Sequence, residues 1–154
     1  MNNNATFDKG LPLAIGADHA GFDYKETIKR QLAGDGWQLS DKGTYSLDSV
    51  DYPDFAHPVA AMVADGTATA GILICGSGNG VCMTANKHPA VRAALCWNEE
   101  LASLARQHNN ANIICFAARF TDKATIEKSL HNWFATDFEA GRHQRRVNKI
   151  EPCS

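Results

Sequence analysis

Residues 71–82 read GILICGSGNGVC, a short apolar run that ends at Cys75 and passes at once into a segment with three glycines. Such a run is too short for a helix and fits a strand buried on both faces, which is typical of a parallel sheet. Glycines past the strand allow a tight turn, and the amide groups of a helix that begins there point at any nearby anion. The stretch therefore predicts a strand, a glycine loop at residues 76–80 and a helix.

The same alternation of short apolar runs and helical patterns continues along the chain. The other runs are at residues 11–17, 37–43, 91–97 and 112–118, of which 37–43 is the weakest. This pattern predicts one α/β domain over residues 11–154, a doubly wound, Rossmann-like parallel sheet of five strands with a basic C-terminal helix. Residues 1–10 lack the features of a signal peptide and are predicted to form a disordered tail.

Composition limits the possible classes of function. The chain has 154 residues, of which 44% are hydrophobic, and its formal net charge is -2. These values argue against disorder and against nucleic-acid or membrane binding driven by bulk charge, and no apolar run is long enough to span a membrane. The five cysteines form an odd set without a Cys-x-x-Cys pair, which indicates a reducing compartment, so we expect a cytoplasmic protein.

Cys75 and the glycine loop allow two interpretations. The spacing Gly-x-Gly-x-Gly matches neither the dinucleotide fingerprint nor a nucleotide-triphosphate loop, so the loop alone fits a tight connection as well as a ligand site. Loop amide groups and the start of a helix favour a thiolate, which acts as a nucleophile or a base. A lone cysteine, however, is more often a small residue that completes a buried strand.

Ligands of doubly wound sheets bind outside the carboxyl ends of the strands. Asp18 and His19 follow the first predicted strand and Arg119 follows the fifth, so we expect these residues near Cys75. Asp18 equally suits the capping of the next helix.

The second half of the chain holds further candidates. His108 shares a predicted helix face with Leu101 and Leu104, which favours a buried histidine, although polar residues surround it. The last predicted helix, at residues 139–150, carries several arginines on one flank, which fits a solvated face or, with Arg119, a phosphate site. No set of histidines, cysteines and acids has the spacing of a metal site.

Six motifs occur in one order: GADHAGF, DKGTYS followed by DYPDFA, ILICGSGNG, ANK, RQHNNAN and GRHQRRV. In this order and spacing the chain resembles the type B ribose-5-phosphate isomerases, within the wider family that also holds the galactose-6-phosphate isomerase subunits. The resemblance covers residues 11–150. It implies an aldose–ketose isomerase that interconverts ribose 5-phosphate and ribulose 5-phosphate through a 1,2-enediolate, without a metal or another cofactor.

The resemblance also implies roles for individual residues. Cys75 is implied as the base that moves a proton between C2 and C1, with Ser77 bonded to substrate oxygens, and His108 as the acid that opens the sugar ring. Val81 stands where another branch of the family has a glutamate, which places this chain in the cysteine branch. The other implied contacts are Asp18, His19, Tyr52, Gly76, Gly78, Asn79, Gly80 and Asn109 for the sugar and enediolate, and His19, Arg119, Arg142 and Arg146 for the phosphate.

Subunits of this family pair and complete each active site across the interface, so we expect a homodimer or a dimer of dimers. Alternative substrates are allose 6-phosphate, erythrose 4-phosphate and galactose 6-phosphate, because the sequence does not reveal the depth of the pocket. A non-catalytic phosphosugar-binding module and a thiol redox protein are alternatives from other classes. The redox alternative is opposed by the absence of a second cysteine beside Cys75.

Overall fold

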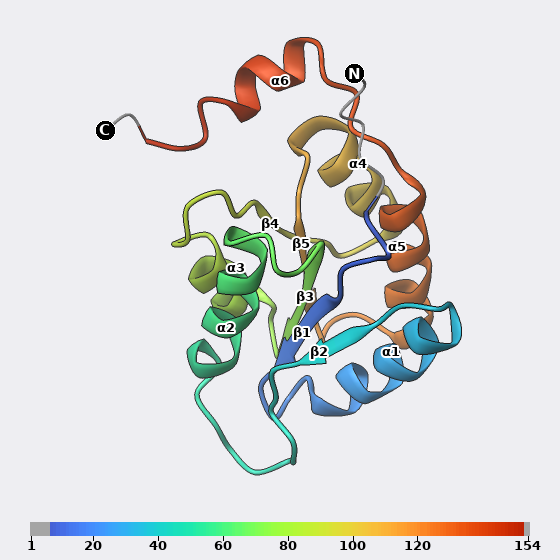
Figure 1. Ribbon diagram of the computed structural model, residues 1–154. Coiled ribbons are helices and arrows are strands. Elements are labelled where there is room, and N and C mark those ends of the chain that lie inside the picture. Colours follow the sequence, from blue (N-terminus) through green and yellow to red (C-terminus); the bar gives the residue numbers. More distant parts are fainter. Residues whose placement is uncertain (1–6, 153–154) are drawn as a thin grey trace.

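The structure, a computed structural model, describes residues 7–152. Five parallel strands form one sheet in the order β2-β1-β3-β5-β4 (Figure 1). The strands are β1 Leu13–Ala17, β2 Leu39–Asp41, β3 Ala70–Cys75, β4 Ala93–Leu95 and β5 Ile113–Ala117. The helices are α1 Phe22–Gly34, α2 Pro53–Ala64, α3 Asn79–Ala85, α4 Glu99–Asn109, α5 Lys123–Ala135 and α6 Arg142–Val147. The predicted doubly wound fold is confirmed.

Helices cover both faces of the sheet, with α1, α4 and α5 on one side and α2 and α3 on the other (Figure 1). Ile15 and Ile74 point towards the first group, whereas Ala14 and Leu73 point towards the second. All four side chains are fully buried, which explains why these strands read as continuous apolar runs. No helix among the described residues is long and apolar enough to cross a membrane.

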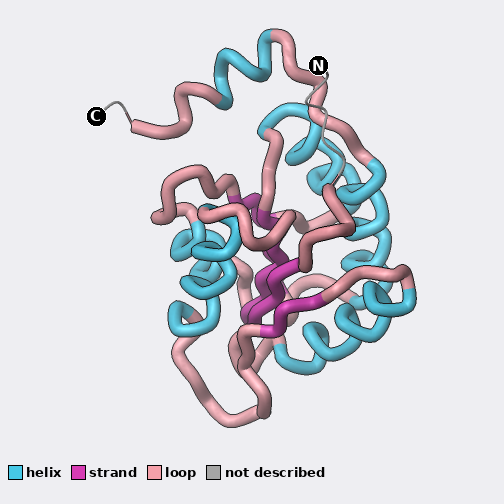
Figure 2. Tube along the Cα trace, in the orientation of Figure 1, coloured by secondary structure: helices cyan, strands magenta, loops and turns pink. Residues whose placement is uncertain are grey.

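Because all strands run in one direction, the sheet has an amino edge, where the strands begin, and a carboxyl edge, where they end. The loop between β2 and α2, residues 42–52, lies at the carboxyl edge, at the bottom of Figure 2. The end of α4 lies at the amino edge, where the chain enters β5, and α6 packs against α4 beyond the body of the sheet (Figure 1). The five residues of β5, at about 3.3 Å each, separate the two edges by roughly 17 Å.

Two predictions are corrected by the packing around α4. Residues 7–10 do not form a free tail, since the Phe7 ring lies 4.5 Å from that of Trp133, while residues 1–6 lie outside the described part of the chain. The buried face of α4 holds Ala102, Ala105 and Arg106, and not the predicted face of larger side chains. Small alanines let α4 lie close to α5, with which it packs extensively.

Candidate active site

Cys75 is the last residue of β3, and the loop that follows folds back over its sulfur. The amide N–H of Gly78 donates a hydrogen bond to Cys75 Sγ over 3.2 Å. Gly78 has a φ of 73°, and a Cβ at this position would collide with the Leu95 side chain and lie 3.0 Å from the backbone of Phe116. Only glycine fits this turn, so the loop that contacts the thiol depends on it. Cys75 itself is 4% exposed.

The other predicted contacts at the carboxyl edge surround this loop. Tyr52 lies over Gly80, where a Cβ would come within 2.5 Å of the phenol ring. Arg119 lies against Gly76, and its amide donates to the Gly76 carbonyl over 3.0 Å. Ser77 and Asn79 line an open pocket of about 360 Å³ together with two exposed aromatic side chains, Trp97 and Phe120.

Asp18 and His19, at the end of β1, lie on the neighbouring strand. The Asp18 amide donates to the carbonyl of Ile74, directly before Cys75, over 3.2 Å. Its carboxylate accepts from the amides of Ala20 and Gly21 at 3.0 and 3.1 Å, so it also caps the turn into α1. His19 Nδ1 accepts from the amide of Val50 at 3.2 Å. Both interpretations of Asp18 are therefore compatible with its position.

A buried ion network, which sequence reasoning missed, holds the loop after β2 against this site. Lys25, fully buried, binds Asp41 and Glu26 at 2.7 and 2.8 Å. Burial alone would raise the pKa of Asp41, but hydrogen bonds from Lys25 and Lys29 outweigh that effect and lower it. Asp41 in turn accepts from the amide of Gly43 over 2.9 Å. Because lysines in helices are usually solvated, nothing in the sequence distinguishes Lys25 from its neighbours.

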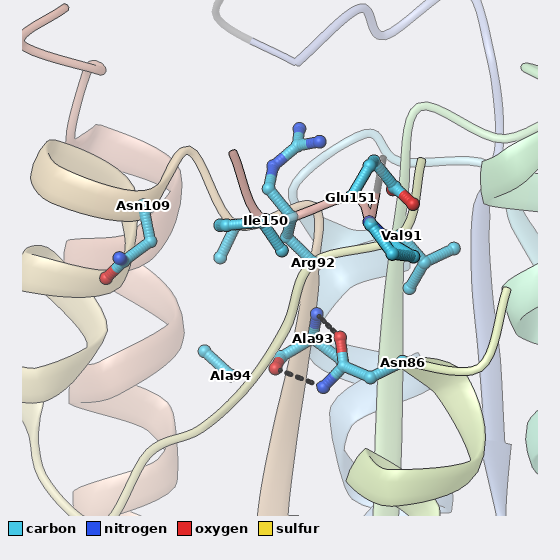
Figure 3. Close-up of a pocket in the computed structure, with 10 residues that line it drawn as sticks. Asn86, Val91, Arg92, Ala93, Ala94, Asn109, Ile150 and Glu151 are labelled. Carbon is cyan, nitrogen blue, oxygen red and sulfur yellow. Dashed lines mark hydrogen bonds between the residues drawn. The ribbon is translucent and has the colours of Figure 1, made fainter. Parts of the chain in front are cut away.

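The remaining predicted residues lie at the amino edge. His108 and Asn109 end α4, and Arg142 and Arg146 belong to α6, which packs on α4. Asn109 lines a second pocket, of about 390 Å³, bounded by β4 and the segment after α6 (Figure 3). The structure thus divides the predicted site into a carboxyl-edge group, around Cys75, and an amino-edge group, around His108.

Hydrogen bonds hold the residues around the pocket beside Asn109 in place. The Asn86 side chain donates to and accepts from the backbone of Ala93, both over 2.9 Å (Figure 3). Glu151 accepts from the amide of Ala90 over 2.7 Å, which fixes the segment after α6 on the loop before β4. These contacts tie the amino-edge group to the sheet, although no residue of the carboxyl-edge group lines this pocket.

His108 has two close partners that sequence reasoning did not single out. Its ring stacks on that of His143 with a centroid distance of 4.2 Å and an interplanar angle of 8°. Glu139 Oε2 lies 3.5 Å from His143 Nε2 and 4.0 Å from His108 Nε2. Loss of solvent, then the nearby His108 and Arg142, lower the pKa of His143. The only sequence signal for His143 is its place between arginines in the basic helix.

The geometry can be compared with known proteins. A sequence model described as Ribose/Galactose Isomerase matches residues 13–150. The chain belongs to the ribose/galactose isomerase family. It is 41% identical over 138 residues to ribose-5-phosphate isomerase B of Escherichia coli, a match that covers 90% of this chain and 93% of that protein. A probable ribose-5-phosphate isomerase B of Mycoplasma genitalium is 44% identical over 88% of this chain and 91% of its own length.

Solved structures in the ribose/galactose isomerase family have the same fold. A ribose 5-phosphate isomerase from Thermotoga maritima matches with a TM-score of 0.90 and 42% identity, covering 93% of this chain and 99% of that one. The ribose-5-phosphate isomerase B from Mycoplasma genitalium with bound ribulose-5-phosphate matches with a TM-score of 0.89 and 42% identity, covering 93% and 95%. The resemblance expected from the six motifs is confirmed.

Proposed function

We propose that this chain interconverts ribose 5-phosphate and ribulose 5-phosphate, with Cys75 as the base. Its family membership supports the reaction class, as does a relative solved with bound ribulose-5-phosphate. The observation that carries the assignment of the base is the 3.2 Å hydrogen bond from the Gly78 amide to Cys75 Sγ. A donor aimed at sulfur stabilises the thiolate, the form that accepts a proton.

The loop and the thiol then serve one proton transfer. The Cys75 thiolate takes the proton from C2 of the open-chain aldose, and C1 and C2 with their oxygens become an enediolate. The O2 proton moves to O1, and the thiol returns its proton to C1, which gives the ketose. Negative charge grows on the substrate oxygens during the first step. Backbone amides of the glycine loop stabilise that charge without having to reorganise, and one such donor typically contributes about 3 kcal/mol. No step of this transfer requires a metal ion.

We further propose that the active site is shared between two copies of the chain. His108 and Cys75 lie at opposite edges of the sheet, separated by about the length of a five-residue strand, roughly 17 Å. An acid that opens a ribose ring and a base that then deprotonates C2 must reach the same small molecule. A two-fold symmetric dimer satisfies this requirement twice, because the amino edge of each copy can meet the carboxyl edge of the other.

The predicted phosphate contacts support the same arrangement. Arg142 and Arg146 lie at the amino edge with His108, whereas His19 and Arg119 lie at the carboxyl edge. Within one chain these side chains cannot surround one phosphate. In a dimer, the guanidinium groups of α6 approach the substrate held by the partner. The homodimer is the smallest assembly with complete sites.

The free thiols of the four described cysteines further support a reducing, cytoplasmic setting.

Replacement of the proposed base tests the mechanism. We expect Cys75→Ala to reduce kcat by about 100-fold or more while ribulose 5-phosphate still binds, because the base is lost and the phosphate contacts remain. Cys82→Ala is the matched control, since Cys82 lies one turn into α3 and its sulfur bonds to Ala93, away from the site. The measurement is turnover together with exchange of the substrate's C2 hydrogen in deuterium oxide. Undiminished turnover or exchange in Cys75→Ala would contradict the assignment.

A comparison of substrates separates the remaining alternatives. Ribose 5-phosphate, allose 6-phosphate, erythrose 4-phosphate and galactose 6-phosphate are assayed side by side with the wild-type chain. We expect the highest kcat/KM for ribose 5-phosphate. A higher value for another sugar would reassign the substrate within the same chemistry, and binding of all four without exchange at C2 would indicate a non-catalytic module.

A further inference from the structure

His108, Glu139 and His143 form a compact group of potential metal ligands at the amino edge. Their ligand atoms all lie within 4.8 Å of one another, although they come from the end of α4, the connection after α5 and the first turn of α6. We propose that this group, the histidine–glutamate cluster, binds Zn²⁺ and that the bound ion inhibits the enzyme. The proposed binding is independent of the reaction, whereas the inhibition rests on the proposed role of His108.

The spacing of the cluster is close to that of a zinc site. In a tetrahedral site with bonds of about 2.1 Å, neighbouring ligand atoms are about 3.4 Å apart. Glu139 Oε2 lies 3.5 Å from His143 Nε2 and 4.0 Å from His108 Nε2. Both imidazole Nε2 atoms therefore lie on the side of the ring stack that faces this carboxylate oxygen. Each Nε2 lone pair lies in its ring plane and the two planes are nearly parallel, so both histidines bind one ion only if the rings leave their stack and tilt towards it. Two histidines and one glutamate are a ligand set that zinc uses when one position stays open.

The cluster is held in place by the backbone around it. The Glu139 amide donates to the carbonyl of Gln107, the residue before His108, over 3.0 Å. The His143 amide donates to the Ala140 carbonyl over 2.9 Å, which starts α6 directly after Glu139. Among the described residues, no other side chain forms a hydrogen bond or ion pair with these three side chains. A metal ion thus competes only with contacts inside the cluster, namely the histidine stack and the approach of Glu139 to both rings.

Two charges near the cluster oppose a cation. Arg142 and Arg146 both act on His143, and their positive charge lowers the affinity for any metal ion. The Glu139 carboxylate offsets part of this effect, and its side chain is 53% exposed, so an ion can reach it from solvent. We therefore expect a weak site, which binds Zn²⁺ when the ion is added to the solution and loses it during purification.

Binding of Zn²⁺ would block the step assigned to His108. A coordinated Nε2 holds no proton, so His108 can no longer protonate the ring oxygen of the sugar. The ion thereby inhibits a reaction that needs no metal. Opening of the ring should be affected more strongly than the proton transfer, because the ion occupies His108 and not the Cys75 thiol that the partner brings to the same substrate.

Direct binding tests the site without reference to activity. Chelator-treated wild-type protein is titrated with Zn²⁺ in equilibrium dialysis, and tetrahedral coordination is followed by the visible absorbance of Co²⁺ in its place. We expect the wild type to bind one Zn²⁺ per chain, and Glu139→Gln and His143→Gln each to bind it at least about tenfold more weakly. Loss of even an indirect partner of a metal ligand typically lowers the metal affinity by that factor. His88→Gln is the matched control, because His88 pairs with His57 at 2.8 Å on the surface outside the cluster.

The inhibition is measured in the same variants, each relative to its own metal-free rate. We expect Zn²⁺ to inhibit the wild type and His88→Gln alike, and to inhibit Glu139→Gln and His143→Gln only at concentrations raised by the same factor as in dialysis. Equal zinc binding by the wild type and both cluster variants would overturn the site. Equal inhibition of all four proteins, as expected if zinc acts on the Cys75 thiolate, would overturn the inhibitory role. Isomerase activity absent from the metal-free wild type would instead count against the proposed function.

Discussion

Two inactive variants of this chain should restore activity when they share a dimer. One variant is Cys75→Ala, which disables the carboxyl-edge group. The other carries His108→Gln and Arg146→Ala, which together disable the amino-edge group. The two groups lie at opposite edges of the sheet, and in the proposed dimer each active site takes one group from each chain. A mixed dimer then contains one site with all the changes and one site with none.

The expected recovery follows from counting sites. Random pairing of equal amounts makes about half of the dimers mixed, and one of the two sites in each is intact, so activity should return to about a quarter of the wild-type value. Mixed dimers isolated with two different affinity tags should reach about half. The assay is conversion of ribose 5-phosphate after co-expression, or after joint unfolding and refolding, which allows the chains to exchange.

A second pair of variants provides the control. Cys75→Ala and Ser77→Ala both disable the carboxyl-edge group, so every site of their mixed dimer retains one of the two changes. We expect no recovery above the level of the unmixed Ser77→Ala protein. If the first pair also failed to recover while tagged mixed dimers were shown to form, Cys75 and His108 would have to act within one chain, and the shared site would be wrong.

Two smaller predictions concern packing at the carboxyl edge. Gly80→Ala should leave the melting temperature unchanged or higher, because alanine favours a helix. Its added Cβ would lie 2.5 Å from the present position of the Tyr52 ring and would displace it, and the loss of one hydrogen bond to the sugar, worth about 1 kcal/mol, should raise KM about fivefold. An unchanged KM would remove Tyr52 from the sugar site. Asp41→Asn should lower the free energy of unfolding at pH 7 by about 2 kcal/mol, because the buried Lys25 loses one of its two carboxylate partners. The pKa of Asp41 is lowered in the folded chain, so this contribution is present above about pH 4 and is lost as the pH falls further. Urea unfolding should therefore show the gap between Asp41→Asn and wild type closing as the pH falls below about 4, and a constant gap would contradict the ion network.

The sequence was sufficient for the sheet because its central strands are buried on both faces. The runs at β1, β3 and β5 are apolar throughout and were located to within two residues at each end. The edge strands β2 and β4 have only three half-buried residues each, and the runs at residues 37–43 and 91–97 located them to within two residues at each end, the first of them weakly. Register and strand order depend on long-range packing, which periodicity does not report.

Prediction of the site was limited in a different way. The glycine loop could be predicted from the sequence, since its residues are neighbours in the chain and its turn requires particular residue types. His108, by contrast, was placed on a face with Leu101 and Leu104, whereas α4 buries Ala102 and Ala105 and leaves the His108 side chain 38% exposed. Contacts between separate segments, such as His108 with Glu139 and His143, are set by tertiary packing. The spacing of these residues along the chain therefore gave no sign of a cluster.

The position of α6 has a consequence for newly made protein. This helix has only six residues and packs on α4 at the far end of the molecule from the glycine loop. In the proposed shared site, a single folded chain is inert, since its own arginines cannot reach its own thiol. Catalysis would begin only when two such chains meet, so specific activity should fall on dilution even while the circular dichroism of the fold stays constant.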